Sequence, residues 1–335
     1  MKVSVAVCTY QGAAHLAEQL ESIAGQTRRP DEVVLSDDGS KDNTLAIARR
    51  ILSAAGIPHK ICVNRSNLGI RRNFEQAIRK STGDIIVLSD QDDVWLPQKI
   101  ERLIQAFESA ADAALVFHDA AVVDEALAPL APSFWKVLCF DVHRFLQRDY
   151  RRLWWGNVVQ GSACAFRRAL LTRALPLSTA AYHDEWLAWA AAASGRILPL
   201  GEVLSKYRQS EANLIGAGQL SLKSRLAAWR KLKARGAFHF GELMRREAAA
   251  ADALRRFKPQ AAAGFAADYG EAVHAFLLWR KQRIKQGAFY LLPHYLRYQR
   301  EYKALQGEGW HPLKEYGKDL AASLVIKKIA ADKRD

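Results

Sequence analysis

The stretch Ile85-Ile86-Val87-Leu88-Ser89-Asp90-Gln91-Asp92-Asp93 joins a short apolar run directly to a cluster of carboxylates. The apolar run predicts a buried strand over 85–88, and the acidic residues follow where that strand ends. Three carboxylates within four residues repel one another unless a cation or a hydrogen-bond network neutralises them. Mg²⁺ and Mn²⁺ prefer such oxygen ligands and commonly bridge a protein carboxylate to substrate phosphates. The stretch therefore predicts a metal site at a strand end, with an Asp-rich turn that caps the next helix as the alternative.

Further apolar runs occur on both sides of this stretch, and helical patterns separate them. Strands are predicted over 3–7, 32–35, 59–63 and 114–118, and helices over 13–24, 43–55, 72–80 and 97–110. Alternation of strands and helices predicts an α/β fold with a mainly parallel, Rossmann-like sheet and right-handed crossovers. Ligands bind beyond the carboxyl ends of the strands in such sheets. Polar clusters at Thr9-Tyr10, Asp37-Asp38 and 90–93 stand at those ends.

The pattern becomes less regular after the fifth predicted strand. We expect a helix over 181–194 and a strand–turn–strand over 197–207, and we expect 119–160 to be mostly irregular. Beyond Gly216 long helical stretches appear, rich in Ala, Leu, Lys and Arg. The chain is therefore predicted to divide into an α/β domain over 1–216 and a helical extension over 217–335.

Composition places the chain among ordinary globular proteins, since half of its 335 residues are hydrophobic and a quarter are charged. The cysteines Cys8, Cys62, Cys139 and Cys164 form no C-x-x-C pair, which argues against a zinc knuckle or a disulfide framework and favours a reducing cytoplasm. The apolar run at the N-terminus is too short for a signal peptide, and no apolar stretch approaches the ~20 residues of a membrane span.

The net charge of +14 is concentrated in the helical extension. Residues 216–335 contain 24 Lys or Arg and 11 Asp or Glu, whereas residues 1–215 contain 25 and 24. Residues 221–246 and 279–285 combine Lys and Arg with Trp and Phe, as in helices that lie on membranes. Peripheral contact with the cytoplasmic face of the inner membrane, binding of an acceptor or partner, and plain packing with a solvated basic face all fit. Trp229, Phe276 and Trp279 of this region fit a packed core more commonly than a lipid anchor. No nucleic-acid partner is expected, because the chain contains no recognised reading module.

Four motifs at successive strand ends resemble those of family 2 of the GT-A glycosyltransferases. They are Val5-Ala-Val-Cys-Thr-Tyr-Gln-Gly12, Ser36-Asp-Asp-Gly-Ser-Lys-Asp-Asn-Thr44, Asn67-Leu-Gly69 with Arg72-Asn-Phe74, and Leu88-Ser-Asp-Gln-Asp-Asp-Val-Trp95. The resemblance covers residues 3–216, and the order of the motifs makes it specific. It implies a GT-A fold and inverting transfer of a sugar from a nucleotide-sugar donor to a carbohydrate or lipid-linked acceptor, with Mn²⁺ or Mg²⁺ as cofactor.

The resemblance also implies roles for single residues. Contacts with the nucleotide are implied for Thr9, Tyr10, Asp37, Asp38, Arg72, Asn73 and Asp90, of which Asp90 reaches the ribose. The metal is implied to bind Asp92, with Asp93 able to share that task.

A catalytic base is expected at the start of the helix over 181–194. The segment His183-Asp184-Glu185-Trp186 fits the family pattern, and Asp184 is our choice, with Glu185 as the rival. The base would deprotonate the acceptor hydroxyl as it attacks the anomeric carbon. Asp184 as a simple helix cap is the alternative. Gln160-Gly161-Ser162 resembles a loop near the donor sugar and the acceptor, or is only a tight turn.

The segment Tyr207-Arg-Gln-Ser-Glu-Ala-Asn-Leu-Ile-Gly216 resembles a segment of the rhamnosyltransferase-like branch. That branch often uses deoxythymidine-diphosphate rhamnose to build bacterial surface polysaccharides, including lipopolysaccharide. Ser210 stands where the branch has histidine, so Ser210, Glu211 or water would have to replace it. Arg208 is expected to counter the charge of the diphosphate.

Two other functions fit parts of the pattern. A nucleotidyltransferase that makes sugar nucleotides would carry a basic, Gly-rich loop after the first strand, and Thr9-Tyr10-Gln11-Gly12 has none. A catalytically inactive module that binds nucleotide sugars or other anions conflicts with the intact acidic motifs, although Ser210 leaves it open.

Overall fold

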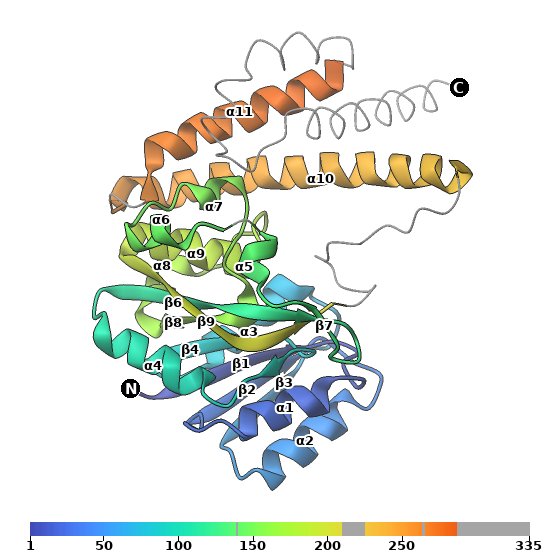
Figure 1. Cartoon of the computed structure of the whole chain (residues 1–335), viewed down its shortest axis with the longest axis vertical. Coiled ribbons are helices and arrows are strands. Elements are labelled where there is room, and N and C mark those ends of the chain that lie inside the picture. The colour runs from blue at the N-terminus through green and yellow to red at the C-terminus, as the bar shows by residue number, and fades with distance from the viewer. Residues whose placement is uncertain (139, 210–224, 263–264, 287–335) are drawn as a thin grey trace. The chain divides into compact units, whose positions relative to one another are not determined.

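The computed structural model describes residues 1–138, 140–209, 225–262 and 265–286 (Figure 1). By its internal contacts the chain forms two compact units, Met1–Gly216 with Phe257–Phe265, and Ala217–Arg256 with Ala266–Asp335.

The first unit is built on one mixed sheet. Its strands are β1 Val3–Thr9, β2 Glu32–Asp37, β3 His59–Val63, β4 Ile85–Ser89, β5 Val94–Trp95, β6 Ala113–Val123, β7 Pro129–Ala131, β8 Cys164–Arg167 and β9 Arg196–Arg208. They follow the order β3-β2-β1-β4-β8-β6-β9-β5, with β7 beside β6. Strands β1 to β4 run parallel, as do β6 and β9, whereas β8 is antiparallel to both of its neighbours. The predicted α/β fold with a mainly parallel sheet is confirmed.

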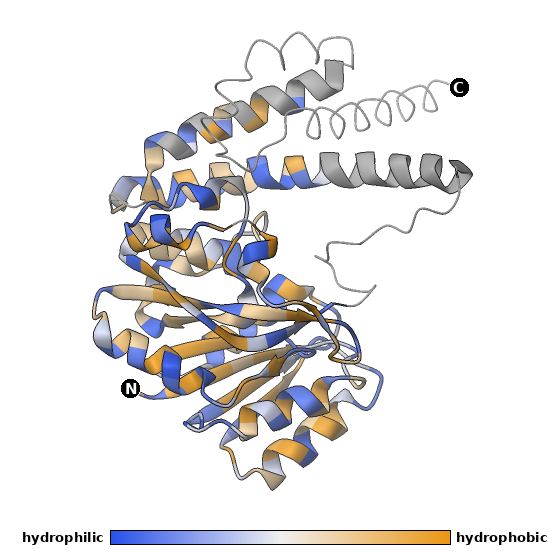
Figure 2. Cartoon of the chain, in the orientation of Figure 1, coloured by the Kyte–Doolittle hydropathy of each residue, from blue (hydrophilic) through white to orange (hydrophobic). Residues whose placement is uncertain are grey.

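Helices cover both faces of this sheet. On one face α1 Leu16–Ala24, α2 Thr44–Ala54 and α4 Lys99–Ser109 bury their apolar sides against alternate strand residues. On the other face α3 Ile70–Lys80 contacts β1 and β2 and also meets α9 His183–Ser194. The strands are accordingly coloured mainly as hydrophobic in Figure 2, while α1 and α2 carry both kinds of residue.

Short helices occupy the connection from β6 to α9. They are α5 Phe134–Val137, α6 Val142–Leu146, α7 Arg152–Trp155 and α8 Leu171–Ala174, with 3₁₀ turns at Gly161–Ala163 and Arg168–Leu170. Cys8, Cys62 and Cys164 are free thiols. Cys139 lies outside the described residues.

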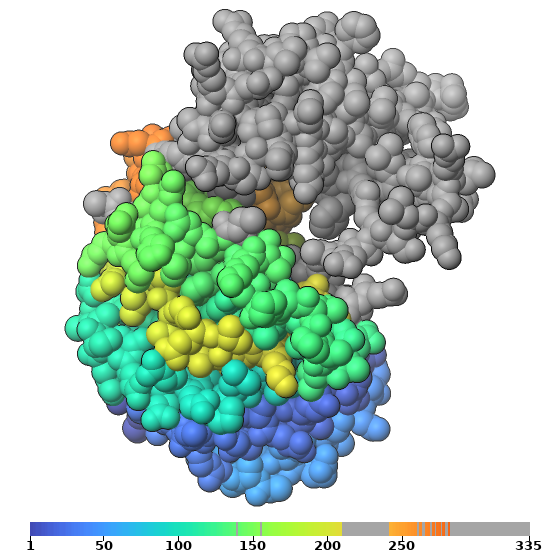
Figure 3. Space-filling view, in the orientation of Figure 1, coloured from blue at the N-terminus to red at the C-terminus, as the bar shows by residue number. Residues whose placement is uncertain are grey.

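The strand positions predicted at 3–7, 32–35, 59–63, 85–88 and 114–118 are confirmed. The strand–turn–strand predicted over 197–207 is wrong, because β9 is one strand that pairs with β6 along its length. The expected turn is instead a register shift, in which His118 and Asp119 of β6 face Leu200 and Val203 of β9. In Figure 3 this segment, coloured yellow, reaches the surface between the teal and green segments.

The second unit contains α10 Arg225–Phe257, except for its last residue, and α11 Ala267–Gln286. Phe257 and the 3₁₀ turn Lys258–Gln260 belong to the first unit. Glu247 of α10 pairs with His274 (3.2 Å) and Lys281 (2.6 Å) of α11. None of the described helices combines the length and apolar content that a bilayer crossing requires. The side chains of Trp229, Phe276 and Trp279, like Ser210 and Glu211, lie outside what the structure describes.

Candidate active site

The carboxyl ends of β1 and β2 are tied together through Asp37. Its Oδ2 accepts from Thr9 Oγ1 (2.8 Å), and its Oδ1 accepts from the backbone N–H groups of Gly39 (3.2 Å) and Ser40 (2.8 Å). The Asp37 side chain is fully buried. The carboxylate therefore shapes the turn after β2, as a helix or turn cap does.

Asp38 holds the loop that precedes α3. Its Oδ1 accepts from Asn64 Nδ2 (2.8 Å) and the Leu68 N–H (2.7 Å), and its Oδ2 accepts from the Gly69 N–H (2.8 Å). Gly69 has φ +82°, a conformation that favours glycine. The loop that would border a bound nucleotide is thus fixed by the residue predicted to meet its base.

Asn73 and Gln91 connect further strand ends through amide groups. Asn73 Nδ2 donates to the carbonyls of Ser36 (2.9 Å) and Thr9 (3.3 Å). Gln91 Oε1 accepts from the Tyr10 N–H (2.8 Å), and Gln91 Nε2 donates to the Tyr10 carbonyl (3.1 Å). This pairing joins the ends of β1 and β4 and leaves the Tyr10 side chain half exposed, in a position to contact a ligand.

The acidic cluster after β4 consists of Asp90, Asp92 and Asp93, whose like charges repel one another. Burial, reinforced by Asp92, Asp93 and Asp184, raises the pKa of Asp90 well above its usual value. Burial also raises the pKa of Asp92, and it raises the pKa of Asp93 to about 7 with help from Asp92. Burial first, and mutual repulsion of Asp90, Asp92 and Asp93 second, thus disfavour the charged forms of these carboxyls.

The donor set fits a hard divalent cation that is shared with a substrate. Among the described residues no three His, Cys, Asp or Glu side chains converge to enclose a metal by themselves. Mg²⁺ and Mn²⁺ sites in phosphate-handling enzymes usually take one or two protein carboxylates and complete the shell with phosphate oxygens and water. Asp92 and Asp93 fit that arrangement.

The Lys99 side chain, in the first turn of α4, is fully buried. Its Nζ donates to the Ser162 carbonyl (2.5 Å) and lies 3.7 Å from the centroid of the Trp95 ring. Burial lowers the pKa of Lys99 to about 7, against the opposing effect of Asp93 and Asp90. Sequence reasoning missed this residue, because a lysine at the start of an amphipathic helix usually faces solvent.

Asp184 stands in the first turn of α9 and faces the Gly161–Ala163 turn. Its Oδ2 accepts from the Gly161 N–H (3.0 Å), and its Oδ1 accepts from the Glu185 N–H (2.8 Å). Burial raises the pKa of Asp184 to about 6, against the hydrogen bonds that lower it. A carboxylate with that pKa, partly exposed and held by backbone donors, is suited to general base chemistry near neutral pH.

The residues next to Asp184 in α9 are buried and fix the helix. Glu185 is buried and accepts from the Tyr182 N–H (3.3 Å), which caps the helix, and Trp186 is buried with its Nε1 on the Ala174 carbonyl (2.8 Å). His183 is buried as well and stacks on Phe74 at 3.8 Å between ring centroids. Burial lowers the pKa of His183 to about 3, so its ring is neutral.

Several polar atoms beside the Gly161–Ala163 turn are buried without a partner among the described residues. They are both amide atoms of Gln160, the Ser162 hydroxyl oxygen and both ring nitrogens of His183. The Ser162 hydroxyl lies near enough to Asp93 to lower its pKa. Buried polar groups are normally hydrogen-bonded, so this concentration indicates a place where a polar ligand binds.

Arg208 and Tyr207 close the cluster from β9. The Arg208 N–H donates to Asp93 Oδ1 (3.1 Å), its Nε donates to the Asp92 carbonyl (2.7 Å), and its guanidinium also pairs with Glu18 and the Glu125 carbonyl. Arg208 is 2% exposed, so in this structure it holds the acidic loop instead of facing solvent. Burial, reinforced by the charges of Asp93 and Asp90, raises the pKa of Tyr207.

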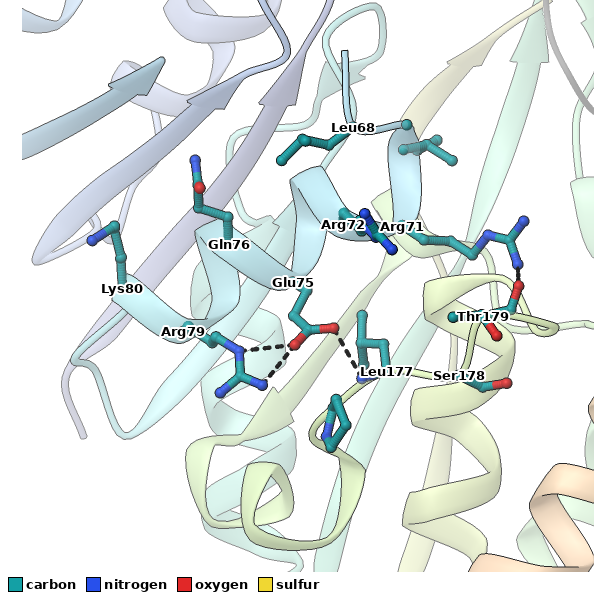
Figure 4. A pocket seen from close by; sticks show the side chains of 13 residues that line it. Leu68, Arg71, Arg72, Glu75, Gln76, Arg79, Lys80, Leu177, Ser178 and Thr179 are labelled. Atoms are coloured by element: carbon teal, nitrogen blue, oxygen red, sulfur yellow. Dashed lines mark hydrogen bonds and ion pairs between the residues drawn. The ribbon is translucent and has the colours of Figure 1, made fainter. Parts of the chain in front are cut away.

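A groove of about 1000 Å³ borders the site along α3, facing the loop from Pro176 to Thr179 (Figure 4). Arg79 in this groove pairs with Glu75, whereas Arg72 is exposed and makes no hydrogen bond or ion pair with the described residues. The groove contains none of the acidic cluster. We therefore expect catalysis at the acidic cluster and Asp184, and we expect the groove to lie beside the place where the nucleotide binds.

The profile of the family described as "Glycosyl transferase family 2" matches residues 4–174. The chain belongs to glycosyl transferase family 2. It is a glycosyltransferase, and the motifs at its strand ends lie within the matched region, with Asp184 just beyond it.

This glycosyltransferase has relatives of several kinds. The uncharacterized glycosyltransferase alr2836 of Nostoc sp. is 28% identical over 222 residues, which cover 64% of this chain and 66% of the relative. The putative glycosyltransferase EpsE of Bacillus subtilis is 33% identical over 32% of this chain and 38% of its own length. The glucosyl-dolichyl phosphate glucuronosyltransferase of Haloferax volcanii is 32% identical over 35% and 37%. The chain thus spans less than two thirds of each of these relatives.

Solved structures share the fold of this glycosyltransferase. S. aureus TarS 1-349 in complex with UDP has a TM-score of 0.55 at 16% identity, with 99% of this chain and 92% of that chain covered. The mannosyltransferase PcManGT from Pyrobaculum calidifontis, in complex with GDP-Man and Mn²⁺, has a TM-score of 0.52 at 18% identity, with 97% and 87% covered.

Proposed function

We propose that this chain is an inverting, metal-dependent glycosyltransferase that transfers a sugar from a nucleoside-diphosphate sugar to a carbohydrate or lipid-linked acceptor. The observation that carries the proposal is the convergence of Asp184 with the acidic cluster. The Gly161–Ala163 turn, whose first N–H donates to Asp184 Oδ2 (3.0 Å), packs against β4, and the acidic cluster follows the end of that strand. The charge of Asp184 accordingly contributes to the raised pKa of Asp90. A base next to a diphosphate site is the arrangement that direct transfer requires.

In the proposed reaction, the Asp184 carboxylate accepts the proton of an acceptor hydroxyl. The oxygen of that hydroxyl forms a bond to the anomeric carbon as the bond from that carbon to the diphosphate oxygen breaks. The nucleoside diphosphate leaves with the electron pair, and the configuration of the anomeric carbon inverts. Hydrogen bonds from Gly161 and Glu185 hold the carboxylate in place for this step.

Asp92 and Asp93 would hold Mn²⁺ or Mg²⁺, and Asp90 would meet the ribose. A bound divalent cation would supply Lewis acidity that stabilises the charge developing on the diphosphate. Support comes from the excess of negative charge at the cluster and from the Mn²⁺ complex of the mannosyltransferase that shares the fold.

The remaining nucleotide contacts are proposed on the same edge of the sheet. Tyr10 is half exposed there, and Asp38 and Asn73 shape the loop and the strand ends beneath it. Arg72 would face the phosphates. The proposed donor is deoxythymidine-diphosphate rhamnose, because the segment that begins with Tyr207-Arg208 resembles the rhamnosyltransferase-like branch. The proposed product is a surface polysaccharide or lipopolysaccharide.

The region near the donor sugar and the acceptor is proposed to contain Gln160, Gly161, Ser162 and His183. The unpartnered polar atoms of Gln160, Ser162 and His183 suit sugar hydroxyls. Glu185 and Trp186 would act only by fixing α9. The proposed location is the cytoplasm, where the basic residues of 217–335 would hold the enzyme peripherally on the inner membrane near lipid-linked acceptors.

Donor hydrolysis tests the proposal. The full chain is incubated with UDP-, GDP- and dTDP-sugars in Mn²⁺, in Mg²⁺ and in chelator, and release of the nucleoside diphosphate is followed. Release from one donor class that needs metal, and that is lost in Asp92→Ala and Asp184→Ala, is expected. Binding of the nucleotide with no turnover of any donor would favour an inactive module. Release of pyrophosphate from a nucleoside triphosphate and a sugar phosphate would favour a nucleotidyltransferase.

A further inference from the structure

The groove between α3 and the loop 176–179 has an excess of positive charge (Figure 4). Its ionisable lining residues are one acid, Glu75, and four bases, Arg71, Arg72, Arg79 and Lys80, so the lining has a net charge of +3. Residues 1–215 together contain 25 basic and 24 acidic residues, so this excess is a local feature of the groove. A concave surface lined by one sign of charge attracts ligands of the opposite sign.

The carboxylate that lines the groove is already neutralised, and it ties the two walls together. Glu75 Oε1 accepts from Arg79 Nη2 (2.6 Å), and Glu75 Oε2 accepts from the Leu177 N–H (3.0 Å). Within the part of the chain that the structure describes, no carboxylate pairs with the remaining bases, which are Arg71, Arg72 and Lys80. The groove therefore combines fixed walls with three positive charges that lack a counter-charge.

One end of the groove adjoins the start of α9, where the proposed base lies. Arg71 Nη1 donates to the carbonyl of Thr179, on the loop that leads into α9 (Figure 4). Phe74 of α3 stacks on His183, the residue that precedes Asp184 (3.8 Å between ring centroids). A ligand that lies in the groove can therefore extend to the base.

The position of the groove favours the acceptor as its occupant. The donor is proposed to bind at the strand ends and the acidic cluster, and apart from Arg72 none of the proposed donor contacts lines the groove. From Arg71 the groove follows α3 to Lys80, about 14 Å at 1.5 Å per residue. Its volume of about 1000 Å³ lies at the upper end of the range for small-molecule sites. An acceptor with one hydroxyl at Asp184 can place the rest of its chain along this helix.

We propose that the groove along α3 is the acceptor site and that it takes a glycan bearing phosphate, whose negative charge is balanced by Arg71 and Lys80. This inference rests on the function proposed above and names the class of its acceptor. With Arg72 assigned to the donor diphosphate, two positive charges remain. A phosphate monoester carries about two negative charges near neutral pH and balances both, whereas a single carboxylate leaves one of them without a counter-charge.

The experiment measures binding of glucose 1-phosphate to the full chain by ligand-observed NMR. UDP and Mn²⁺ are present throughout, so that the probe does not enter the nucleotide site. Glucose serves as the neutral probe and glucuronic acid as the carboxylate probe. Wild type should bind glucose 1-phosphate about tenfold more tightly than either, because hydrogen bonds between ionised groups are the stronger ones and the phosphate carries the larger charge.

Two double variants remove the same charge from opposite faces of the sheet. The groove variant, Arg71→Gln with Lys80→Gln, keeps a side-chain N–H at position 71 for the Thr179 carbonyl. The control variant is Arg49→Gln with Arg50→Gln, at exposed neighbouring arginines of α2. Glucose 1-phosphate should bind about tenfold more weakly to the groove variant, and to the control variant within about twofold of wild type.

Equal affinity of wild type and the groove variant would overturn the proposal, and so would an equal loss in the control variant, which would point to total charge. Glucuronic acid that binds as tightly as glucose 1-phosphate would overturn the assignment of phosphate. If the groove variant does not fold, Lys80→Gln alone decides, because the exposed Lys80 side chain makes no hydrogen bond or ion pair with the described residues. It should weaken binding about threefold, and unchanged binding would overturn the proposal.

The UDP arm separates the two proposals. Wild type that binds neither UDP nor glucose 1-phosphate would contradict the proposed function itself. Wild type that binds UDP with Mn²⁺ but does not bind glucose 1-phosphate would contradict only the assignment of the groove to a phosphate-bearing acceptor.

Discussion

The carboxylate of Asp184 accepts a hydrogen bond from the backbone N–H of Gly161, with 3.0 Å between Oδ2 and the nitrogen. The two residues belong to different parts of the connection around β8, and the contact sets the direction in which the carboxylate presents its remaining lone pairs. This contact fixes the geometry of the proposed base, whereas burial sets its working pH by raising the pKa of Asp184 to about 6 against the hydrogen bonds that lower it.

The first prediction concerns the pH dependence of transfer. A base works in its ionised form, so kcat/KM should rise about tenfold per pH unit below pH ~6 and reach a plateau above it. Initial rates between pH 4.5 and 8.5, at saturating Mn²⁺, measure this limb. Asp184→Asn should abolish the limb together with most of the activity, and retention of the limb in that variant would assign it to another group.

The second prediction concerns stability at the same residue. The carboxyl of an unfolded chain has a pKa near 3.9, so between pH ~4 and ~6 the unfolded state loses its proton before the folded state does. The contribution of Asp184 to stability therefore falls as pH rises through this window. Asp184→Asn should be more stable than wild type at pH 7.5 by the order of 1–2 kcal/mol, with no difference near pH 4. Thermal unfolding of both proteins at the two pH values measures this, and a variant that is less stable at pH 7.5 would contradict it.

The third prediction uses the close approach at Gly161. A Cβ at this position would lie 2.7 Å from His183 Nε2, and the His183 ring is fixed by its stacking on Phe74. Gly161→Ala should therefore displace the turn and reduce kcat about 100-fold. Gly201→Ala is the matched control, since a Cβ there would meet no atom within 4 Å. Equal activity of the two variants would show that the position of the turn does not matter for transfer.

The fourth prediction separates the two kinds of arginine on α3. Arg79 pairs with Glu75 through Nη2 at 2.6 Å, whereas Arg72 is exposed with no such partner among the described residues. Arg72→Ala should raise the KM for the donor about tenfold and leave kcat nearly unchanged, because it removes uniform binding of the phosphates. Arg79→Ala should change neither constant by more than about twofold, in line with the small effects of exposed ion pairs. The reverse pattern would place the nucleotide elsewhere.

Residues at the strand ends could be predicted because the physics is local. An apolar run followed by polar residues marks the end of a buried parallel strand, and such ends meet at one edge, which brought Thr9, Asp37 and Asp90 together. The burial of Lys99 and its contact with Ser162 could not be predicted. They depend on β8, a strand of four residues that enters the sheet between β4 and β6 and brings Gly161–Ala163 over the start of α4.

The sequence could not distinguish the roles of carboxylates that are neighbours in the chain. Asp37 and Asp38 are neighbours in the chain, yet one shapes its own turn and the other holds the loop before α3. Asp184 and Glu185 differ in the same way, since one faces the Gly161–Ala163 turn and the other caps α9. Such differences depend on which backbone N–H groups tertiary structure brings near each side chain.

The last prediction concerns Gln91, whose amide bridges the backbone N–H and carbonyl of Tyr10 at 2.8 and 3.1 Å. Gly12 leaves room for this amide, because a Cβ there would lie 2.3 Å from Gln91 Oε1. Gln91→Ala removes both hydrogen bonds and frees the loop that carries Tyr10 against the nucleotide. The KM for the donor should rise about tenfold, with a smaller fall in kcat, while Gln98→Ala, at an exposed glutamine that makes no side-chain cap, should behave as wild type. Calorimetric titration with UDP measures the same loss without turnover. Unchanged UDP binding in Gln91→Ala would show that the β1–β4 bridge serves the fold alone and that Tyr10 does not meet the nucleotide.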